Sequence, residues 1–227
     1  GGSQIAGTTE GGATLQLVAS FGETHTVAGS PNWDVARTRF STTTLTISGP
    51  RWFVRNQLDV ESGTINGGDL LVRGTLNWSG GTMGGSGITT IERGGVLNLS
   101  GGVLTRDLQN EGRINITGTM AASNPVRIVN RETGVIDFQN NASFGTFLGN
   151  SRLDNLGVIV KSGLTGASNI DAIVASTGTI LADRGTLNFR AGLTQGAGQT
   201  VLSGGSVAAA NFLLQGGELS GTGTFAG

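Results

Sequence analysis

The stretch that decides the fold is residues 74–94, which read Gly-Thr-Leu-Asn-Trp-Ser-Gly-Gly-Thr-Met-Gly-Gly-Ser-Gly-Ile-Thr-Thr-Ile-Glu-Arg-Gly. Three short stretches with strand character, 76–78, 82–83 and 88–91, are separated by corners rich in glycine. Side chains alternate between the two faces of a strand, so Leu76 and Trp78 point one way and Asn77 the other. Three sides within about twenty residues predict one turn of a parallel β-helix.

The first of these stretches recurs along the chain. Its leading apolar residue falls at Leu58, Leu76, Leu97, Ile114, Ile136, Ile159, Leu187 and Val207. A period of about twenty residues is typical of stacked-repeat proteins, in which each unit buries its apolar face only against its neighbours. We therefore predict an all-β fold, a β-solenoid with about 20 residues per three-sided turn, forming a single domain over residues 1–227.

The repeat is less regular in two places. Residues 1–56 are expected to form irregular turns with a loop or side insertion near 31–40, whereas residues 57–227 are regular. The long step between Ile159 and Leu187 predicts a bulged corner near residues 168–173. No polar cap is visible at either end, and the chain begins Gly1-Gly2-Ser3. We therefore expect an excised or processed segment whose end turns stack on other copies or on neighbouring repeats of a longer chain.

Other folds agree less well with the sequence. The chain contains 41 glycines, and each costs about 1 kcal/mol relative to alanine inside a helix. An antiparallel sandwich predicts hairpin turns such as Asn-Gly, and Asn66-Gly67 is the only such dipeptide.

Composition excludes several classes of partner. The net charge is −1 and Lys161 is the only lysine, so no basic surface for nucleic acid is expected. No apolar run approaches the roughly 20 residues of a membrane span. The absence of cysteine excludes disulfides and thiolate metal sites.

Stacked turns align equivalent side chains into columns. Two inner columns are expected, one with Leu58, Leu76, Leu97, Ile114, Ile136 and Leu187, the other with Val60, Trp78, Leu99, Ile116, Phe138 and Phe189. The outward position between them predicts a polar ladder formed by Asp59, Asn77, Asn98, Asn115, Asp137 and Asn188. Such a ladder could face a repetitive ligand, such as a polysaccharide or a row of cations. We favour the other interpretation, in which the side chains bond to one another, as amide ladders do in stacked sheets.

Two tryptophans outside the regular repeat, Trp33 and Trp52, are candidate aromatic platforms for sugars. The alternative is that they cover the first turns as an apolar lid.

Catalytic chemistry has little support. His25, the only histidine, is expected at the surface, and no serine lies in a nucleophile-elbow sequence. Asp171, Asp183 and Glu218 fall at unrelated repeat positions, so the carboxylate pair of a glycoside hydrolase is not predicted. The calcium-binding Gly-Gly-x-Gly-x-Asp pattern is absent. We predict a non-enzymatic protein with no cofactor and no metal.

The repeats resemble those of bacterial autotransporter passenger domains and filamentous-haemagglutinin-type exoproteins. The resemblance is carried by Gly-Thr-Leu-Asn-Trp-Ser-Gly-Gly-Thr-Met from Gly74, Gly-Val-Leu-Asn-Leu-Ser-Gly-Gly-Val-Leu from Gly95 and Gly-Glu-Leu-Ser-Gly-Thr-Gly-Thr-Phe from Gly217. It covers residues 57–227 and consists of repeat style, with no functional residue carried over. It implies a right-handed parallel β-helix, extracellular or on a bacterial cell surface, used as a stalk or fibre in adhesion.

The expected function is therefore a non-catalytic structural or adhesive protein, a segment or subunit of a cell-surface fibre that polymerises end to end by stacking of turns. Expected partners are further copies or repeats, and a polysaccharide or cell-surface ligand. The alternative is a β-helix protein that binds or degrades polysaccharide, as a lyase or hydrolase. The residue clusters typical of pectin-degrading β-helices have no counterpart in this sequence.

Overall fold

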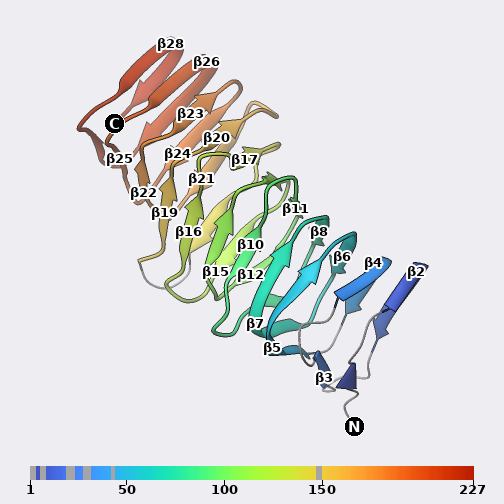
Figure 1. The fold of residues 1–227 in the computed structure, drawn as a ribbon. Coiled ribbons are helices and arrows are strands. Elements are labelled where there is room, and N and C mark those ends of the chain that lie inside the picture. Colours follow the sequence, from blue (N-terminus) through green and yellow to red (C-terminus); the bar gives the residue numbers. More distant parts are fainter. Residues whose placement is uncertain (1–3, 6–8, 19–23, 28–31, 42–43, 147–149) are drawn as a thin grey trace.

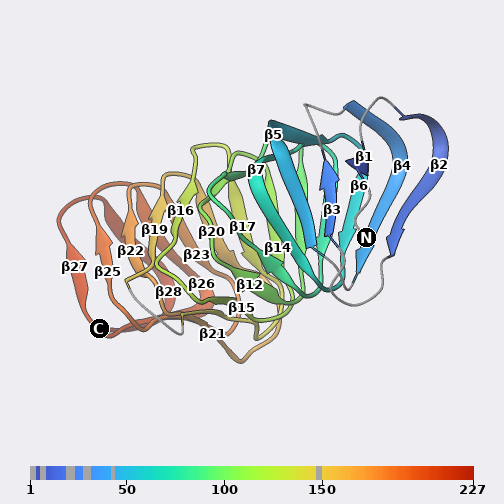
Figure 2. The same cartoon turned by 90° about the horizontal axis from the view of Figure 1, so that it is seen from below.

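The computed structural model describes residues 4–5, 9–18, 24–27, 32–41, 44–146 and 150–227. These residues form 28 β-strands and no helix, and every strand pairing among them is parallel. The strands wind into a β-solenoid of about nine turns, spaced about 20 residues apart along the chain (Figures 1 and 2). The predicted fold class is confirmed.

Most turns contribute one short strand to each of three faces. The first face contains β6 (Gln57–Val60), β8 (Thr75–Trp78), β11 (Val96–Leu99), β14 (Arg113–Ile116), β17 (Val135–Phe138), β20 (Val158–Lys161) and β23 (Thr179–Ala182). The second face contains β9 (Thr82–Met83), β12 (Gly102–Leu104), β15 (Met120–Ala122), β18 (Phe144–Thr146), β21 (Ala167–Ile170) and β24 (Thr186–Phe189). The third face contains β10 (Thr89–Ile91), β13 (Leu108–Asn110), β16 (Arg127–Asn130), β19 (Arg152–Asn155), β22 (Ile173–Ser176), β25 (Leu193–Gln195) and β27 (Phe212–Leu214).

Longer strands run across a corner and belong to two faces at once. In the first turns these are β2 (Thr9–Val18), β4 (Asn32–Ser41), β5 (Thr44–Val54) and β7 (Thr64–Val72). In the last turns they are β26 (Gln199–Ala209) and β28 (Glu218–Ala226). The short strands β1 (Gln4–Ile5) and β3 (Thr24–Val27) pair with each other, and β3 also pairs with β5. The loop or insertion expected near 31–40 is therefore wrong, because β4 pairs with β2 on one side and β6 on the other.

The core is a narrow apolar column enclosed by the three faces. On the first face the inward side chains stack in register from Leu58 through Leu76, Leu97 and Ile114 to Ile136, as predicted. The second inner column, which contains Val60, Trp78, Leu99, Ile116 and Phe138, is confirmed as well, and all of these side chains are buried.

The register of the later turns differs from the prediction. Ile159 pairs with Ile180, and Ile180 with Thr200, so the first face continues at its normal step. Leu187 and Phe189 belong to the second face, where they pair with Ser168 and Ile170. The prediction of a bulged corner near 168–173 is wrong, because residues 168–170 lie in β21, residue 173 begins β22, and only two residues connect the strands. The phrase Gly-Thr-Leu-Asn-Phe appears on a second face, and sequence matching alone cannot tell the faces apart.

Glycine is required where a corner touches the core. Gly102 has a φ of 124°, a conformation that other residues rarely adopt. A Cβ atom at this position would lie 2.4 Å from Cε2 of Trp78. Trp78 is buried, and its Nε1 donates a hydrogen bond to the carbonyl oxygen of Gly80 at 2.8 Å. Gly102 therefore makes room for the ring of Trp78 in the neighbouring turn.

Candidate functional site

The outward ladder of the first face is a continuous hydrogen-bonded chain over five turns. Asn115 Nδ2 donates to Asn98 Oδ1 at 2.9 Å, and Asn98 Nδ2 donates to Asn77 Oδ1 at 2.9 Å. Asn77 Nδ2 in turn donates to the carboxylate of Asp59 at 2.7 Å. The amides therefore point one way along the axis and end on a group that only accepts.

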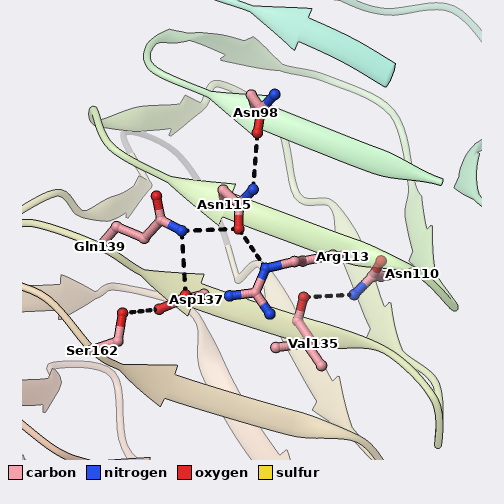
Figure 3. A network of polar contacts seen from close by, with 8 residues as sticks. All are labelled: Asn98, Asn110, Arg113, Asn115, Val135, Asp137, Gln139 and Ser162. Atoms are coloured by element: carbon pink, nitrogen blue, oxygen red, sulfur yellow. Dashed lines mark hydrogen bonds and ion pairs between the residues drawn. The ribbon is translucent and has the colours of Figure 1, made fainter. Parts of the chain in front are cut away.

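The other end of this ladder is held by a cluster of charged and polar side chains (Figure 3). Arg113 donates from Nε to Asn115 Oδ1 at 2.7 Å and from Nη2 to Asp137 Oδ2 at 2.5 Å. Gln139 Nε2 reaches the same two residues, at 3.1 and 3.3 Å, and Ser162 Oγ donates to Asp137 Oδ1 at 2.6 Å. The side chains of this ladder therefore bond to one another and to their neighbours within the protein, as in the interpretation favoured from the sequence.

Asn188 is not part of this ladder, which corrects the predicted set of six. It lies on the second face in β24, where its Nδ2 donates to Asn169 Oδ1 at 2.9 Å. The position next to Asp137 on the first face is Val160, whose side chain is apolar. Asp59, Asn77, Asn98, Asn115 and Asp137 remain as the outer ladder.

The aromatic candidates are not brought together as sugar platforms. Trp52 is 1% exposed and packs in the core of β5, so it is not available to a ligand. The side chain of Trp33 lies outside the described residues, although its backbone belongs to β4. His25, expected at the surface, is buried on β3, at a position that pairs with the core residue Leu45.

A second ladder, inside the solenoid, was not predicted. It lies at the corner between the third and first faces and contains Asn110, Asn130, Asn155, Ser176 and Gln195. Asn110 donates to Asn130, and Asn130 to Asn155, each at 2.8 Å, and Asn155 donates to Ser176 Oγ at 3.0 Å. The asparagine amides also donate to backbone carbonyls of the corner. Oδ1 of Asn110, at the start of the ladder, is buried and accepts no hydrogen bond from the described residues.

A weak sequence signal marks this inner ladder. In Leu108-Gln-Asn110, Ile128-Val-Asn130 and Leu153-Asp-Asn155, an apolar residue stands two positions before the asparagine. A glycine follows each asparagine, but after two, four and two residues respectively, so the motif has no fixed length.

Lys161 occupies an inward position of the first face, next to Phe138 in the column, and its side chain is fully buried. Its ammonium group donates to the carbonyl oxygens of Asn140 at 2.8 Å and Leu164 at 3.3 Å, and to that of Gly163. Burial lowers the pKa of Lys161, while the negative charge of Asp137 opposes this shift. The backbone carbonyls compensate the buried charge.

Arg106 is a second buried cation, at the corner between the second and third faces. Its guanidinium donates to the carbonyl oxygens of Gly87 at 2.8 Å, Gly84 at 3.1 Å and Gly68 at 2.5 Å. Burial lowers its pKa to about 10, and Asp69 opposes the shift. One side chain thus joins glycine-rich corners of successive turns.

The third face carries an open groove of about 610 Å³. Its floor is formed by the outward side chains of Asp154, Ala175 and Thr194, which lie in register on β19, β22 and β25. One rim is formed by Arg127, Arg152 and Ile173, and the other by Leu156, Thr177, Gly196 and Gln215. The groove exists because small side chains in the floor lie between taller ones.

An ion-pair cluster closes one end of this groove. Arg127 Nε and Nη2 each lie 2.8 Å from Asp154 Oδ2, and Arg152 Nε lies 2.5 Å from Asp154 Oδ1. Burial alone would raise the pKa of Asp154, but the hydrogen bonds and charges of Arg152 and Arg127 outweigh it and lower the pKa. Two guanidinium groups thus share one ionised carboxylate, and these three side chains carry a net charge of +1. Asp107, whose carboxylate accepts the backbone N–H of Arg127 at 2.9 Å, does not line the groove.

Within the described parts of the chain, no group of three or more histidine, cysteine, aspartate or glutamate side chains is placed to hold a metal ion. In the same residues no helix is long and apolar enough to cross a membrane. No family model, curated protein or solved structure matches this chain.

Proposed function

We propose that this protein is a non-catalytic structural element, a rigid segment or subunit of an extracellular fibre on a bacterial cell surface. The observation that carries the proposal is the pair of side-chain ladders, one outside and one inside the same stack of turns. Each ladder joins successive turns by hydrogen bonds in addition to the backbone bonds of the parallel sheet. Such a stack resists bending and separation of its turns.

The outer ladder is better suited to joining turns than to binding a ligand. Asn77, Asn98 and Asn115 each use the side-chain oxygen and one N–H of Nδ2 within the ladder, and a ligand that took these groups would have to replace the bonds. The extracellular location follows the resemblance of the repeats to surface fibres and adhesins.

End-to-end stacking is part of the proposal. In the last turn of the described residues, Leu214 and Leu219 continue inward positions of the preceding turns but are 45% and 39% exposed. Another turn of the same kind would bury both side chains and pair the outer edge of β28.

Negative-stain electron microscopy of the purified chain over a concentration series tests the proposal. We expect straight, unbranched rods that lengthen into filaments as the concentration rises. Bent or collapsed particles at all concentrations would contradict a rigid fibre element. Short straight rods that never lengthen would retain the structural role and exclude stacking between copies. Gold labelling of intact cells tests the location.

A further inference from the structure

We propose that the groove on the third face binds a glycan whose sugars carry carboxylate groups. This inference goes beyond the structural role, because a fibre element needs no ligand, and the outer ladder of the first face does not take part in it.

The guanidinium groups supply the recognition of a carboxylate. Arg127 and Arg152 have side chains that are 62% and 54% exposed, whereas the Asp154 carboxylate between them is 12% exposed. Asp154 binds Nε of both residues and Nη2 of Arg127. Nη1 of Arg127 and both Nη groups of Arg152 make no hydrogen bond to Asp154, so they are able to donate to a ligand oxygen. Asp154 therefore orients the pair while leaving the cluster positive.

The remainder of the groove suits a sugar chain. Ala175 gives a small apolar area in the floor and Ile173, which is 43% exposed, gives an apolar edge, against which the C–H faces of a pyranose can pack. Thr177, Thr194 and Gln215 provide hydroxyl and amide groups for sugar hydroxyls. The volume of about 610 Å³ falls in the usual range of ligand sites, roughly 300–1,000 Å³. The floor crosses three strands, which is about 10 Å along the axis.

Other anionic ligands fit less well. A peptide in extended conformation needs a free strand edge, but β19, β22 and β25 each have a hydrogen-bonded neighbour on both sides. A lipid chain needs an enclosed apolar channel, and this groove is open to solvent. A charged, hydroxyl-rich polymer lying along the axis needs neither a free strand edge nor an enclosed channel.

The test is isothermal titration calorimetry of the purified chain with acidic hexasaccharides of three kinds, made of galacturonate, mannuronate or the hyaluronan disaccharide. The fully methyl-esterified galacturonate hexamer and hexaglutamate serve as comparison probes. We expect at least one acidic hexasaccharide to bind with a Kd of about 1 mM or tighter. Binding should weaken as salt rises, because the contact is between charges. The ester should bind at least about tenfold more weakly, since it lacks the charge-assisted hydrogen bonds.

Variants locate the site. Arg152→Gln and Ala175→Phe should each weaken binding at least about tenfold, the first by removing a guanidinium and the second by filling the floor. Ala175 points outward, so the second variant should melt close to the wild-type temperature, which separates loss of binding from loss of folding. Arg93→Gln removes the same charge from an exposed corner outside the groove and should leave the affinity unchanged.

Four outcomes overturn the proposal: no binding by any acidic hexasaccharide, equal binding of the methyl ester, tighter binding of hexaglutamate, or full affinity in the folded Ala175→Phe variant. None of them bears on whether the protein forms straight rods, so failure of this proposal and failure of the structural role are distinguishable.

Discussion

Asn130 donates a hydrogen bond from Nδ2 to Oδ1 of Asn155, one turn further along the solenoid, at 2.8 Å. On the outside of the same stack, Asn115 donates to Asn98, which lies one turn back. The two ladders therefore run in opposite directions. Their orientations are fixed by their anchors, because the outer ladder ends on the carboxylate of Asp59 and the inner amides also donate to backbone carbonyls. The register between these turns is thus fixed both by the backbone hydrogen bonds of the sheet and by the side-chain hydrogen bonds of the ladders.

The inner ladder should contribute far more to stability than the outer one. Asn130→Ala removes a fully buried amide and its hydrogen bonds with Asn110, Asn155 and two backbone carbonyls. We expect a loss of about 3 kcal/mol or more in the free energy of unfolding. Asn98→Ala removes an exposed amide of the outer ladder and should cost about 1 kcal/mol or less. Urea denaturation followed by circular dichroism measures both, and equal losses would contradict the assignment of inside and outside.

The in/out alternation of the first face gives a second prediction. Ile116 is buried between Leu99 and Phe138, so Ile116→Asp places a charge in the apolar column. We expect a loss of about 4 kcal/mol or more. Its neighbour Asn115 points outward, and Asn115→Ser should cost about 1 kcal/mol, since it loses bonds to Asn98, Arg113 and Gln139 that water can replace. Thermal melting of the two variants checks which one loses more stability. A larger loss in Asn115→Ser would mean that Asn115 points inward and Ile116 outward.

The sequence predicts the first face correctly up to Ile159 and assigns the later strands to the wrong face. Period-2 alternation with an asparagine at the centre placed Leu76, Leu97 and Ile114 correctly, because the same phrase recurs on the same face. The phrase Gly178-Thr-Ile-Leu-Ala182 was missed, because Leu181 replaces the asparagine, and Leu187 was assigned to the first face in its place. Repeats specify a period, but only backbone pairing distinguishes one face from another.

The candidate sites were harder to predict for a different reason. A lysine at an inward position contradicts the apolar pattern, and Lys161 is tolerated there because carbonyls of its own corner and of the corner one turn back point toward the ammonium. The groove depends on the heights of side chains from five turns, Arg127 to Gln215, which no local motif describes. The outer ladder was predictable because its members occupy one repeat position.

Alanine substitutions at two glycines with positive φ distinguish the cost of backbone strain from the cost of a steric clash. At Gly94, with a φ of 86°, an added Cβ would meet no atom within 4 Å. Gly94→Ala should therefore cost only the backbone strain, about 1–2 kcal/mol. Gly102→Ala adds a collision with the buried ring of Trp78 and should cost at least about 2 kcal/mol more. The Trp78 fluorescence should change in the second variant alone. Equal melting temperatures would contradict the close contact between Gly102 and Trp78.

The buried ammonium of Lys161 predicts a pH dependence with a definite sign. Burial lowers its pKa in the folded protein, whereas in the unfolded chain the pKa is near the ordinary value of about 10.4. Between these two values the unfolded chain binds more protons than the folded one, so the free energy of unfolding contributed by this residue rises with pH. Below the folded pKa and above about 10.4 the contribution is flat.

Lys161→Met isolates this effect, because Arg106 also has a lowered pKa and contributes in the same alkaline range in both proteins. The difference in unfolding free energy, wild type minus Lys161→Met, should increase as the pH is raised toward about 10.4. The matched variant Arg93→Gln removes an exposed cation and controls for the loss of one positive charge. A decrease for Lys161→Met would mean that the carbonyls of Asn140, Gly163 and Leu164 stabilise the charged form more than burial opposes it, and that the folded pKa is raised.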